Sequence, residues 1–516
     1  MKTNVKSGTY MQNRSMPDNR KASNLNPTQV GFVTLAVTAI LLLAVTPAFA
    51  RGWANVQPPS AVGQWSAPIN IGIVGIHAAL LRSGKVLMWY YPAVSGANSP
   101  AVVFDPNTNT ATRNDITSAS DFFCSGSTIL PDGKVMIIGG LNGIPPSPDY
   151  GIAAVEFYDP VTSKWSAGTP MTYARWYPTA LAMPDATIYA ISGTDATGTN
   201  LVLPVEVYRP GSGVWQTMPT KANIPPTSQT YPRMSVLTNG KLLMSGTGAF
   251  TRLFDPVAKT WSTLGTMNYG SRVYGGVVLL PGLQKILTAG GHATVSGPAT
   301  NTAEILDLTK PTPAWAYTGS MTFPRYNLGL TLLADGTVLA VGGNQVSKYS
   351  KPVEAAELYN PATGTWTVMA SQVARRGYHS TSLLLPDGRV LSAGSDDFVA
   401  PDMSQTVEIY SPPYLFQGAR PTITSAPTSL KYNAAFTITT ADAATITRVA
   451  LIRPGSVTHA DDFDQRYVDL AFTTGVGVVN ATAPLSGNYA PPGYYMLVIV
   501  NSSGVPSVMP FLRLSN

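Results

Sequence analysis

Side chains able to do metal or redox chemistry recur at one phase of a repeated β unit. Cys124 is the only cysteine among 516 residues, so the chain has no second cysteine with which to form a disulfide. Such a thiol is either an inert buried residue or a reactive group. Two later repeats carry the aromatic pairs Trp176-Tyr177 and Tyr378-His379 at the phase of Cys124. A thiol and two phenols that converge at one end of a β structure predict a redox site.

The Tyr378-His379 pair also indicates a metal site. Adjacent residues of a regular strand point to opposite faces, so both can bind one metal only where a strand begins or bends. We place the pair at such a strand start. Phenolate and imidazole ligands suit a tetragonal Cu(II) site better than a Ca²⁺ or Mg²⁺ site. The chain has four histidines, and we expect His77 and His292 to be hydrogen-bonded structural or pocket-lining residues rather than ligands.

Seven repeats position these side chains. Each repeat has an apolar strand, a tight turn, a second apolar strand that usually ends in glycine, and an aromatic-Asx-Pro turn with a following Trp. The second strands begin at Lys85, Lys134, Thr187, Lys241, Lys285, Thr337 and Arg389. This period of about 50 residues is that of kelch repeats. Four strands in each of seven repeats predict an all-β fold with a seven-bladed kelch-type β-propeller over residues 51–415.

The first strand of each blade lies nearest the propeller axis, so the residues at its start surround one mouth. Counting back ten or eleven residues from the second strands gives six ring positions: Cys124, Tyr177, Tyr231, Tyr274, Tyr326 and Tyr378. For Tyr231, Tyr274 and Tyr326, filling of the channel and lining of a substrate pocket both remain open. Arg272 and Arg325, near ring tyrosines, could hydrogen-bond a substrate or form surface ion pairs.

The period stops after residue 413, and residues 416–516 have a different organisation. Short strands such as residues 448–452 and 494–500 alternate with turns and do not carry the glycine-ended second strand of the repeats. About a hundred residues of this kind fit an immunoglobulin-like β-sandwich. We therefore expect two folded domains, residues 51–415 and residues 416–516.

Residues 1–50 predict a secretion signal. Basic residues precede a nearly apolar run at residues 30–45, Pro47 follows, and Ala48-Phe49-Ala50 fits a signal-peptidase site. As a helix the apolar run spans about 24 Å, short of the ~30 Å hydrocarbon core, which disfavours an uncleaved anchor. We expect a mature chain that begins at Arg51, is secreted to the extracellular or periplasmic space, and keeps no stable membrane insertion.

Loss of this segment lowers the formal net charge from +6 to about +2. A charge this small gives no electrostatic reason to expect nucleic-acid binding. The low content of charged residues, 12%, is typical of an extracellular β protein. We expect the mature protein to be a monomer.

Several segments resemble the galactose oxidase and glyoxal oxidase family of copper-radical oxidases, and they are closer to the glyoxal oxidase form. Residues 376–390, around Tyr378-His379, look like the family's copper-ligand segment, and residues 123–126 look like its cross-linking cysteine segment. Residues 174–178 are similar to its modified-tyrosine segment. Residues 451–466, which include His459, are similar to its final-histidine loop. The resemblance covers nearly all of residues 65–516.

The resemblance implies one copper ion held by Tyr177, Tyr378, His379 and His459, with Tyr378 as the axial phenolate and general base. It also implies a thioether bond between Cys124 and the Tyr177 ring, which makes this phenol easier to oxidise to a radical. The implied activity is two-electron oxidation of a small alcohol or aldehyde by O2, with release of hydrogen peroxide.

Two further inferences follow from the resemblance. The tryptophan that stacks over the modified tyrosine in galactose oxidase has no counterpart in residues 193–198, and Trp176 is the nearby candidate to replace it. The alternative function, a non-catalytic kelch-repeat extracellular binding protein, has no reason to retain Cys124, both tyrosines and both histidines together.

Overall fold

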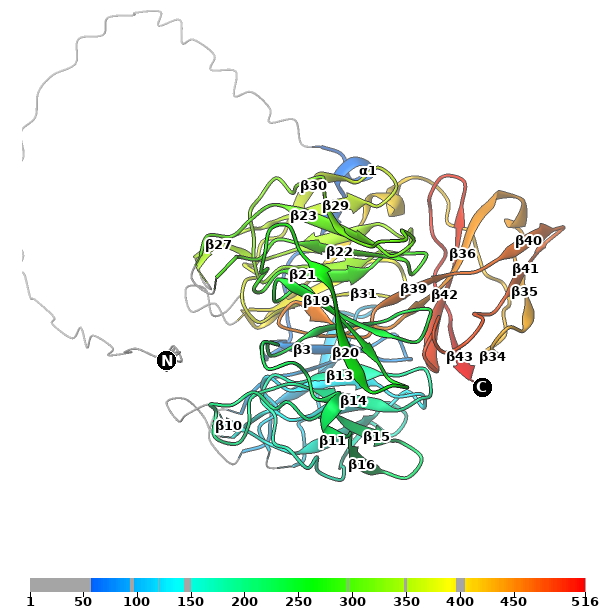
Figure 1. The fold of residues 1–516 in the computed structure, drawn as a ribbon. Coiled ribbons are helices and arrows are strands. Elements are labelled where there is room, and N and C mark those ends of the chain that lie inside the picture. Colours follow the sequence, from blue (N-terminus) through cyan, green and yellow to red (C-terminus); the bar gives the residue numbers. More distant parts are fainter. Residues whose placement is uncertain are drawn as a thin grey trace, which may run out of the picture. The chain divides into compact units, whose positions relative to one another are not determined.

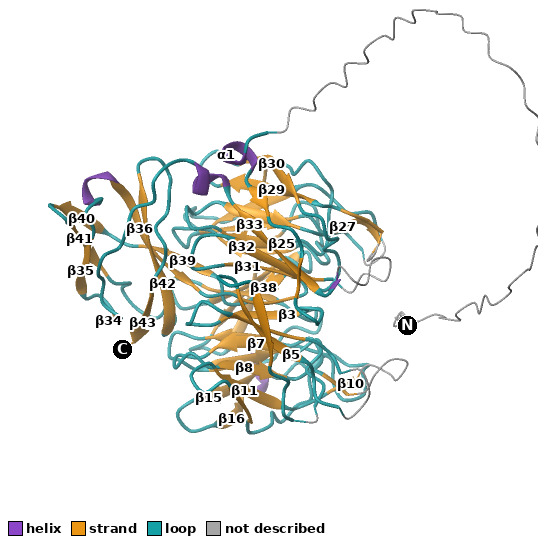
Figure 2. Cartoon of the chain, turned by 180° about the vertical axis from the view of Figure 1, so that it is seen from behind, coloured by secondary structure: helices purple, strands orange, loops and turns teal. Residues whose placement is uncertain are grey.

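The computed structural model describes residues 57–515, apart from residues 93–96, 119, 143–149, 295–296, 348–349 and 396–403. The predicted signal segment, residues 1–50, lies outside the described residues. Residues from Gln57 onward form one compact unit. This part is nearly all β, as Figures 1 and 2 show. Its short helical turns are α1 (Pro59–Val62), η1 (Thr220–Ala222), η2 (Pro413–Phe416) and η3 (Ala443–Thr445). None of these described helices is long and apolar enough to cross a membrane.

The second to sixth repeats each form an antiparallel sheet of four strands, with the first strand of the repeat at one edge. The second repeat has β7 (Gly126–Ile129), β8 (Val135–Ile138), β11 (Val155–Asp159) and β12 (Lys164–Ala167). The third has β13 (Thr179–Ala182), β14 (Ile188–Ile191), β15 (Glu206–Arg209) and β16 (Val214–Thr217). The fourth has β17 (Arg233–Val236), β18 (Leu242–Ser245), β19 (Phe250–Asp255) and β20 (Thr260–Thr266).

The remaining two of these sheets follow the same order. The fifth repeat has β21 (Gly276–Leu279), β22 (Lys285–Ala289), β23 (Ala303–Asp307) and β24 (Trp315–Thr318). The sixth has β25 (Gly329–Leu332), β26 (Val338–Val341), β29 (Ala355–Asn360) and β30 (Thr365–Ser371). In the second and sixth repeats, the segment that connects the second and third strands forms a two-stranded ribbon. These ribbons are β9 (Leu141–Asn142) with β10 (Tyr150–Gly151), and β27 (Asn344–Ser347) with β28 (Ser350–Pro352).

The first and seventh repeats form larger sheets because strands from elsewhere join them. The seventh has β31 (Ser380–Leu384), β32 (Val390–Gly394) and β33 (Thr406–Ser411), and β1 (Gln64–Trp65) and β2 (Ile69–Asn70) pair with β33. The start of the folded chain therefore completes the sheet of its last repeat. The first repeat has β3 (His77–Leu80), β4 (Val86–Trp89), β5 (Ala101–Asp105) and β6 (Thr110–Arg113).

The C-terminal residues form two sheets and a hairpin. The five-stranded sheet has β34 (Ser429–Lys431), β36 (Ile446–Arg453), β39 (Arg466–Asp469), β42 (Gly493–Asn501) and β43 (Phe511–Ser515). The three-stranded sheet has β35 (Ala435–Thr439), β40 (Phe472–Gly475) and β41 (Val478–Thr482). The hairpin of β37 (Ser456–Thr458) and β38 (Asp461–Asp462) leaves these sheets and pairs with β3 of the first repeat (Figure 2).

Buried arginine–glutamate pairs brace four of the repeats. The pairs are Arg175–Glu206, Arg272–Glu304, Arg325–Glu357 and Arg376–Glu408, and every one of these side chains is fully buried. Each guanidinium also donates to a carbonyl at the end of the second strand of its repeat, as from Arg272 to Gly290 at 2.9 Å. The prediction that Arg272 and Arg325 contact a substrate or the surface is therefore wrong. A guanidinium with so many internal partners stabilises the repeat.

We expect Arg272→Met to lower the free energy of unfolding by about 3–5 kcal/mol, because it leaves the Glu304 carboxylate buried without its partner. Lys285→Met on the same sheet is the control. It breaks a half-exposed ion pair with Asp307 at 3.7 Å and should cost less than about 1 kcal/mol. Chemical denaturation of both variants tests this, and equal losses would show that the buried pair adds nothing.

Candidate functional site

A left-handed residue stands just before the first strand of each of the second to seventh repeats. These residues are Cys124 (φ 56°), Tyr177 (φ 61°), Tyr231 (φ 45°), Tyr274 (φ 57°), Asn327 (φ 56°) and His379 (φ 67°). A positive φ is uncommon for residues other than glycine, and such strained residues cluster at functional sites. Because of this bend, the side chains of these residues do not follow the alternation between opposite faces that a regular strand imposes.

This register corrects two of the predicted ring positions. Tyr326 and Tyr378 stand one residue before the left-handed positions, which belong to Asn327 and His379. The turn after the first strand is one residue longer in the fifth repeat than in the sixth and seventh. A count of eleven residues is therefore right for Tyr274 and one too many for the last two repeats.

Backbone hydrogen bonds join these positions between neighbouring repeats. The N–H of Tyr177 donates to the carbonyl of Cys124 at 3.0 Å, and the N–H of Tyr231 donates to the carbonyl of Tyr177 at 2.9 Å. In the same way Asn327 donates to Tyr274 at 2.8 Å. Residues that are far apart in sequence thus become direct neighbours, and the thiol of Cys124 comes to lie against the phenol of Tyr177.

The structure brings all five predicted site residues into one cluster. The His459 Nε2 atom lies 3.0 Å from the Tyr177 hydroxyl and 3.3 Å from the Cys124 Sγ atom. The hydroxyls of Tyr177 and Tyr378 form a hydrogen bond. Ligand atoms of Cys124, His379 and His459 all lie within 4.8 Å of one another. None of the five side chains is more than 8% exposed, so the cluster is shielded from water.

Tyr378 and His379 share the site because the backbone bends between them and β31. Their ring centroids are 3.7 Å apart, and His379 has the left-handed conformation. In a regular strand the two side chains would point to opposite faces. The prediction that this pair lies at a strand start is therefore confirmed.

His459 reaches the cluster at the tip of the β37–β38 hairpin. His459 and Ala460 form its two-residue turn, with φ values of 53° and 68°, as in a type I′ turn. The His459 Nδ1 atom lies 2.7 Å from the Thr458 hydroxyl, so the Nε2 atom is the one that faces Cys124 and Tyr177. The N–H of Ala460 donates to the carbonyl of Ser380 at 2.7 Å, which ties the tip to the seventh repeat.

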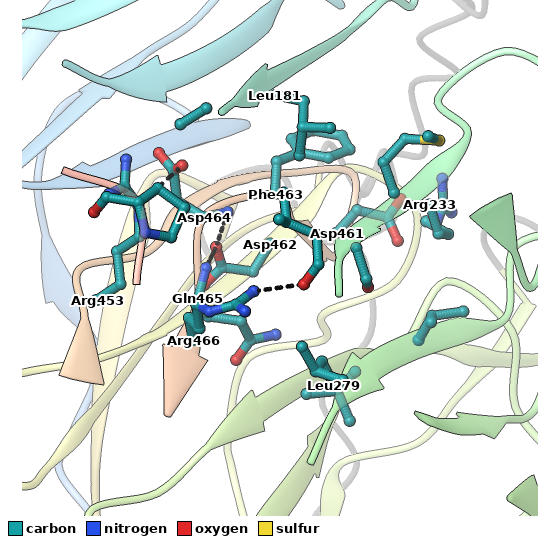
Figure 3. A pocket seen from close by; sticks show the side chains of 17 residues that line it. Leu181, Arg233, Leu279, Arg453, Asp461, Asp462, Phe463, Asp464, Gln465 and Arg466 are labelled. Atoms are coloured by element: carbon teal, nitrogen blue, oxygen red, sulfur yellow. Dashed lines mark hydrogen bonds and ion pairs between the residues drawn. The ribbon is translucent and has the colours of Figure 1, made fainter. Parts of the chain in front are cut away.

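A buried cluster of charges anchors this hairpin. The Asp464 carboxylate accepts hydrogen bonds from the N–H of Ile129 at 2.7 Å and from Arg453 at 3.2 Å. Asp461 forms an ion pair with Arg233 at 2.5 Å. Figure 3 shows these side chains around a hollow between the hairpin and the first strands of the third to fifth repeats. The contacts with Ile129 and Arg233 tie the hairpin to the second and fourth repeats.

Burial controls the protonation of the cluster. It raises the pKa of Tyr177 well above its ordinary value, and the nearby Cys124, Tyr378 and Tyr231 side chains raise it further. A phenol in this environment loses its proton to a base, and a metal ion bound to the oxygen favours that loss. Two phenols and two imidazoles are the oxygen and nitrogen donors that Cu(II) prefers, and no carboxylate belongs to the cluster within the described residues.

His77 and His292 take hydrogen-bonded positions, as predicted. The His77 Nε2 atom accepts from the N–H of Cys124 at 3.1 Å. The His292 Nδ1 atom lies 3.0 Å from the carbonyl of Gly297, and its ring packs on Tyr326 with a centroid distance of 4.4 Å. Desolvation lowers the pKa of both histidines below the ordinary value, which keeps them neutral.

Sequence reasoning missed two side chains at the site. The Phe123 ring lies edge-on to His379 at 5.1 Å, and the Thr458 hydroxyl meets the ring of His459. Both are sequence neighbours of predicted site residues, which is the only sequence signal for them. Trp176, expected as a stacking substitute, lies 4.3 Å from the Tyr177 ring at 83°, so it meets that ring edge-to-face rather than stacked.

Comparison with known proteins identifies the family. Residues 95–414 match the family model described as Glyoxal oxidase N-terminus, which is more than half of the chain. The chain belongs to the glyoxal oxidase family. Residues 420–514 match the model described as Galactose oxidase-like, Early set domain. The resemblance read from the cysteine, tyrosine and histidine segments is confirmed.

Individual proteins similar to this member of the glyoxal oxidase family are also named as oxidases. Galactose oxidase from Gibberella zeae is 29% identical, over 94% of this chain and 77% of the relative. The aldehyde oxidase GLOX of Vitis pseudoreticulata is 26% identical, over 88% of this chain and 97% of the relative. A solved fungal alcohol oxidase of the AA5 family, in complex with copper, matches with a TM-score of 0.78 and 26% identity. That match covers 88% of this chain and 100% of the solved chain.

We expect Asp121, three residues before Cys124, to make stability depend on pH. Burial raises the pKa of its carboxyl to about 7, against the hydrogen bond from Phe123 that lowers it. The folded state therefore holds this proton more tightly than the unfolded chain, and the Asp121 contribution to stability falls as pH rises from about 4 to about 7.

Asp121→Asn should flatten this part of the pH dependence, measured as the free energy of unfolding at about pH 5 and about pH 8. Asp132→Asn is the control, because that side chain is half-exposed on a hairpin turn. A wild-type difference between the two pH values that Asp121→Asn leaves intact would contradict the assignment.

Proposed function

We propose that this protein is a secreted copper-radical oxidase that oxidises an alcohol or aldehyde with O2 and releases hydrogen peroxide. The observation that carries the proposal is the buried cluster of Cys124, Tyr177, Tyr378, His379 and His459. Membership of the glyoxal oxidase family supports it, as do the oxidase names of the relatives. The rival, a non-catalytic extracellular binding protein, would not need these donors gathered away from water.

The proposed architecture follows the repeats. The seven repeats are the blades of a kelch-type propeller in residues 51–415, and pairing of β1 and β2 with β33 of the seventh repeat closes it. Residues 416–516 are the immunoglobulin-like sandwich, in which two sheets carry the hairpin to the propeller. Residues 1–50 are the secretion signal, and the mature protein is a monomer.

Tyr177, Tyr378, His379 and His459 are the proposed ligands of one copper ion. They fit it because two phenol oxygens and two imidazoles converge from three separate segments in a water-shielded space. When bound, copper supplies a one-electron redox couple and an acidic centre that favours deprotonated phenols. The neutral imidazoles need not lose a proton to bind it.

Cys124 and Tyr177 are the proposed source of a protein-derived cofactor. A thioether between the thiol sulfur and the phenol ring makes the ring easier to oxidise, so Tyr177 can store one oxidising equivalent. Trp176 and Tyr231 meet this ring edge-to-face at 4.3 and 4.6 Å. We propose that they shield it from solvent in place of a stacked tryptophan.

Tyr378 is the proposed general base. Its hydroxyl is hydrogen-bonded to that of Tyr177, at the centre of the cluster, so a substrate hydroxyl bound there would lie within its reach. The alcohol loses two electrons and two protons, and O2 takes up both to become hydrogen peroxide. Tyr378 accepts the hydroxyl proton, and Tyr177 shares in the removal of the electrons.

Tyr274, His292 and Tyr326 are candidates for the substrate pocket. Tyr274 lies 6.2 Å from Tyr378 between ring centroids and 5.9 Å from His292, which in turn packs on Tyr326. These polar-tipped rings form one aromatic wall beside the proposed base. They suit a small polar substrate such as an alcohol, a hydrated aldehyde or a sugar.

A peroxide-release screen of copper-loaded protein over small aldehydes, alcohols and sugars tests the function. Cys124→Ser is the matched control, because a hydroxyl cannot form the thioether. The oxidase proposal predicts peroxide from the wild type with at least one substrate and little from Cys124→Ser. Copper-loaded, cross-linked protein that releases none with any of them would favour the binding-protein rival.

We expect copper and O2 to join Cys124 to Tyr177, since the thiol already lies against the phenol. Peptide mapping should find the two peptides linked, with the loss of two hydrogen atoms. Alkylation offers an independent check, because a thioether sulfur does not react. Complete alkylation of Cys124 in unfolded protein after copper and O2 treatment would exclude the radical mechanism.

Tyr378→Phe should separate metal binding from turnover. The variant keeps His379 and His459 and the Cys124–Tyr177 contact, so it should still bind copper and form the thioether. Loss of the general base should slow turnover by roughly 10²–10⁴-fold. His379→Ala and His459→Ala should instead lose copper and, with it, the cross-link. A Tyr378→Phe enzyme with wild-type turnover would mean that another group accepts the proton.

A further inference from the structure

His77 hydrogen-bonds the backbone of the cross-linking cysteine, and its ring lies edge-on to that of the proposed ligand His459, with a centroid distance of 6.1 Å. It is the first residue of β3 and is fully buried. Its Nε2 atom accepts a hydrogen bond from the N–H of Cys124 at 3.1 Å. Its ring stacks on Trp89 with a centroid distance of 4.8 Å and an interplanar angle of 8°. The stacking fixes the plane of the imidazole, and so the direction in which Nε2 points.

This hydrogen bond acts where the backbone is strained. Cys124 has φ 56°, which a cysteine adopts only when its surroundings hold it there. The left-handed bend directs its buried N–H away from the strand ladder and toward His77. A buried amide without an acceptor is unfavourable, so the imidazole stabilises this one conformation of Cys124 over others.

His77 also links Cys124 to the hairpin that carries His459. In the β3–β37 pairing, His77 stands opposite Thr458, the residue before His459. The strand therefore holds the hairpin through its backbone and the cysteine through its side chain. The Sγ atom of Cys124 lies 3.3 Å from the Nε2 atom of His459 within this arrangement.

We propose that His77 is a positioning residue for formation of the Cys124–Tyr177 thioether. The proposal rests on the proposed function. In this step the S–H bond of Cys124 and one ring C–H bond of Tyr177 break and a C–S bond forms. The two electrons and two protons released reduce O2 to hydrogen peroxide. By holding the Cys124 backbone, His77 keeps the sulfur against the ring carbon it must attack.

The test is the rate of thioether formation in two variants of the full chain after addition of copper and O2. His77→Phe keeps a ring that can stack on Trp89 and removes the acceptor. His77→Gln restores an acceptor oxygen at nearly the reach of Nε2. Since small misplacements of reacting groups can slow a reaction about 10²-fold, we expect His77→Phe to cross-link roughly 10- to 100-fold more slowly. His77→Gln should recover most of the rate.

Copper affinity, measured in the same samples, separates this role from ligation. His77→Phe should bind copper within about threefold of the wild type, because the proposed ligands are unchanged. Wild-type cross-linking rates in both variants would overturn the His77 proposal and leave the proposed function standing. A wild-type chain that never cross-links would overturn both. A large loss of copper affinity in His77→Phe would overturn the positioning role in favour of a metal role.

If His77→Phe does not fold, as judged by circular dichroism, His77→Asn replaces it. Asparagine keeps a polar side chain but its shorter reach brings the acceptor less close to the Cys124 N–H. We expect the cross-linking rate to fall in the order wild type, His77→Gln, His77→Asn. Equal rates for the two amide variants would contradict a hydrogen bond of defined length.

Discussion

The hydrogen bond from the N–H of Tyr177 to the carbonyl of Cys124 is the contact on which the rest of the site depends. It forms because both residues adopt a left-handed conformation at the start of the first strand of their repeats. The bend directs the backbone N–H and C=O groups of one repeat toward the next repeat. The side chains of Cys124 and Tyr177 are thereby brought together. A regular strand would have pointed them to alternate faces of separate sheets. The local strain at these residues is thus the means by which sequential repeats make one shared site.

The second requirement is a side chain that the repeats do not contain. His459 comes from the C-terminal sheets on a hairpin whose tip must be held to a fraction of an ångström for metal or redox chemistry. The hairpin is held to the repeats by pairing of β37 with β3, by the N–H of Ala460 on the carbonyl of Ser380, by the N–H of Ile129 on Asp464, and by the ion pair of Asp461 with Arg233. The two parts of the chain therefore complete one site, which gives a physical reason for them to occur together.

Rigidity around the cluster comes from buried charge as well as from apolar packing. In each arginine–glutamate pair, the arginine lies just before the bend that precedes a first strand. It pairs with a glutamate on a later strand of the same repeat and donates to a carbonyl at the end of the second strand. A buried ion pair by itself adds little net stability, but its hydrogen bonds restrict each side chain to one geometry. We infer that these pairs hold the strained residues in place, two or three positions further along the chain.

The repeats, the strands, the glycine turns and the five residues of the buried cluster could be predicted from the sequence alone. These features are local: apolar periodicity, turn residues and residue type can be read without knowing any long-range contact. Three features depend on long-range contacts. The turn after the first strand is one residue shorter in the sixth and seventh repeats than in the fifth, so Asn327 and His379 rather than Tyr326 and Tyr378 hold the left-handed positions. Arg272 and Arg325, predicted as candidate substrate contacts, are buried in ion pairs with Glu304 and Glu357. The imidazole of His77 accepts a hydrogen bond from the buried N–H of Cys124 because the packing of strands brings the two residues together. Their spacing along the chain does not predict this contact.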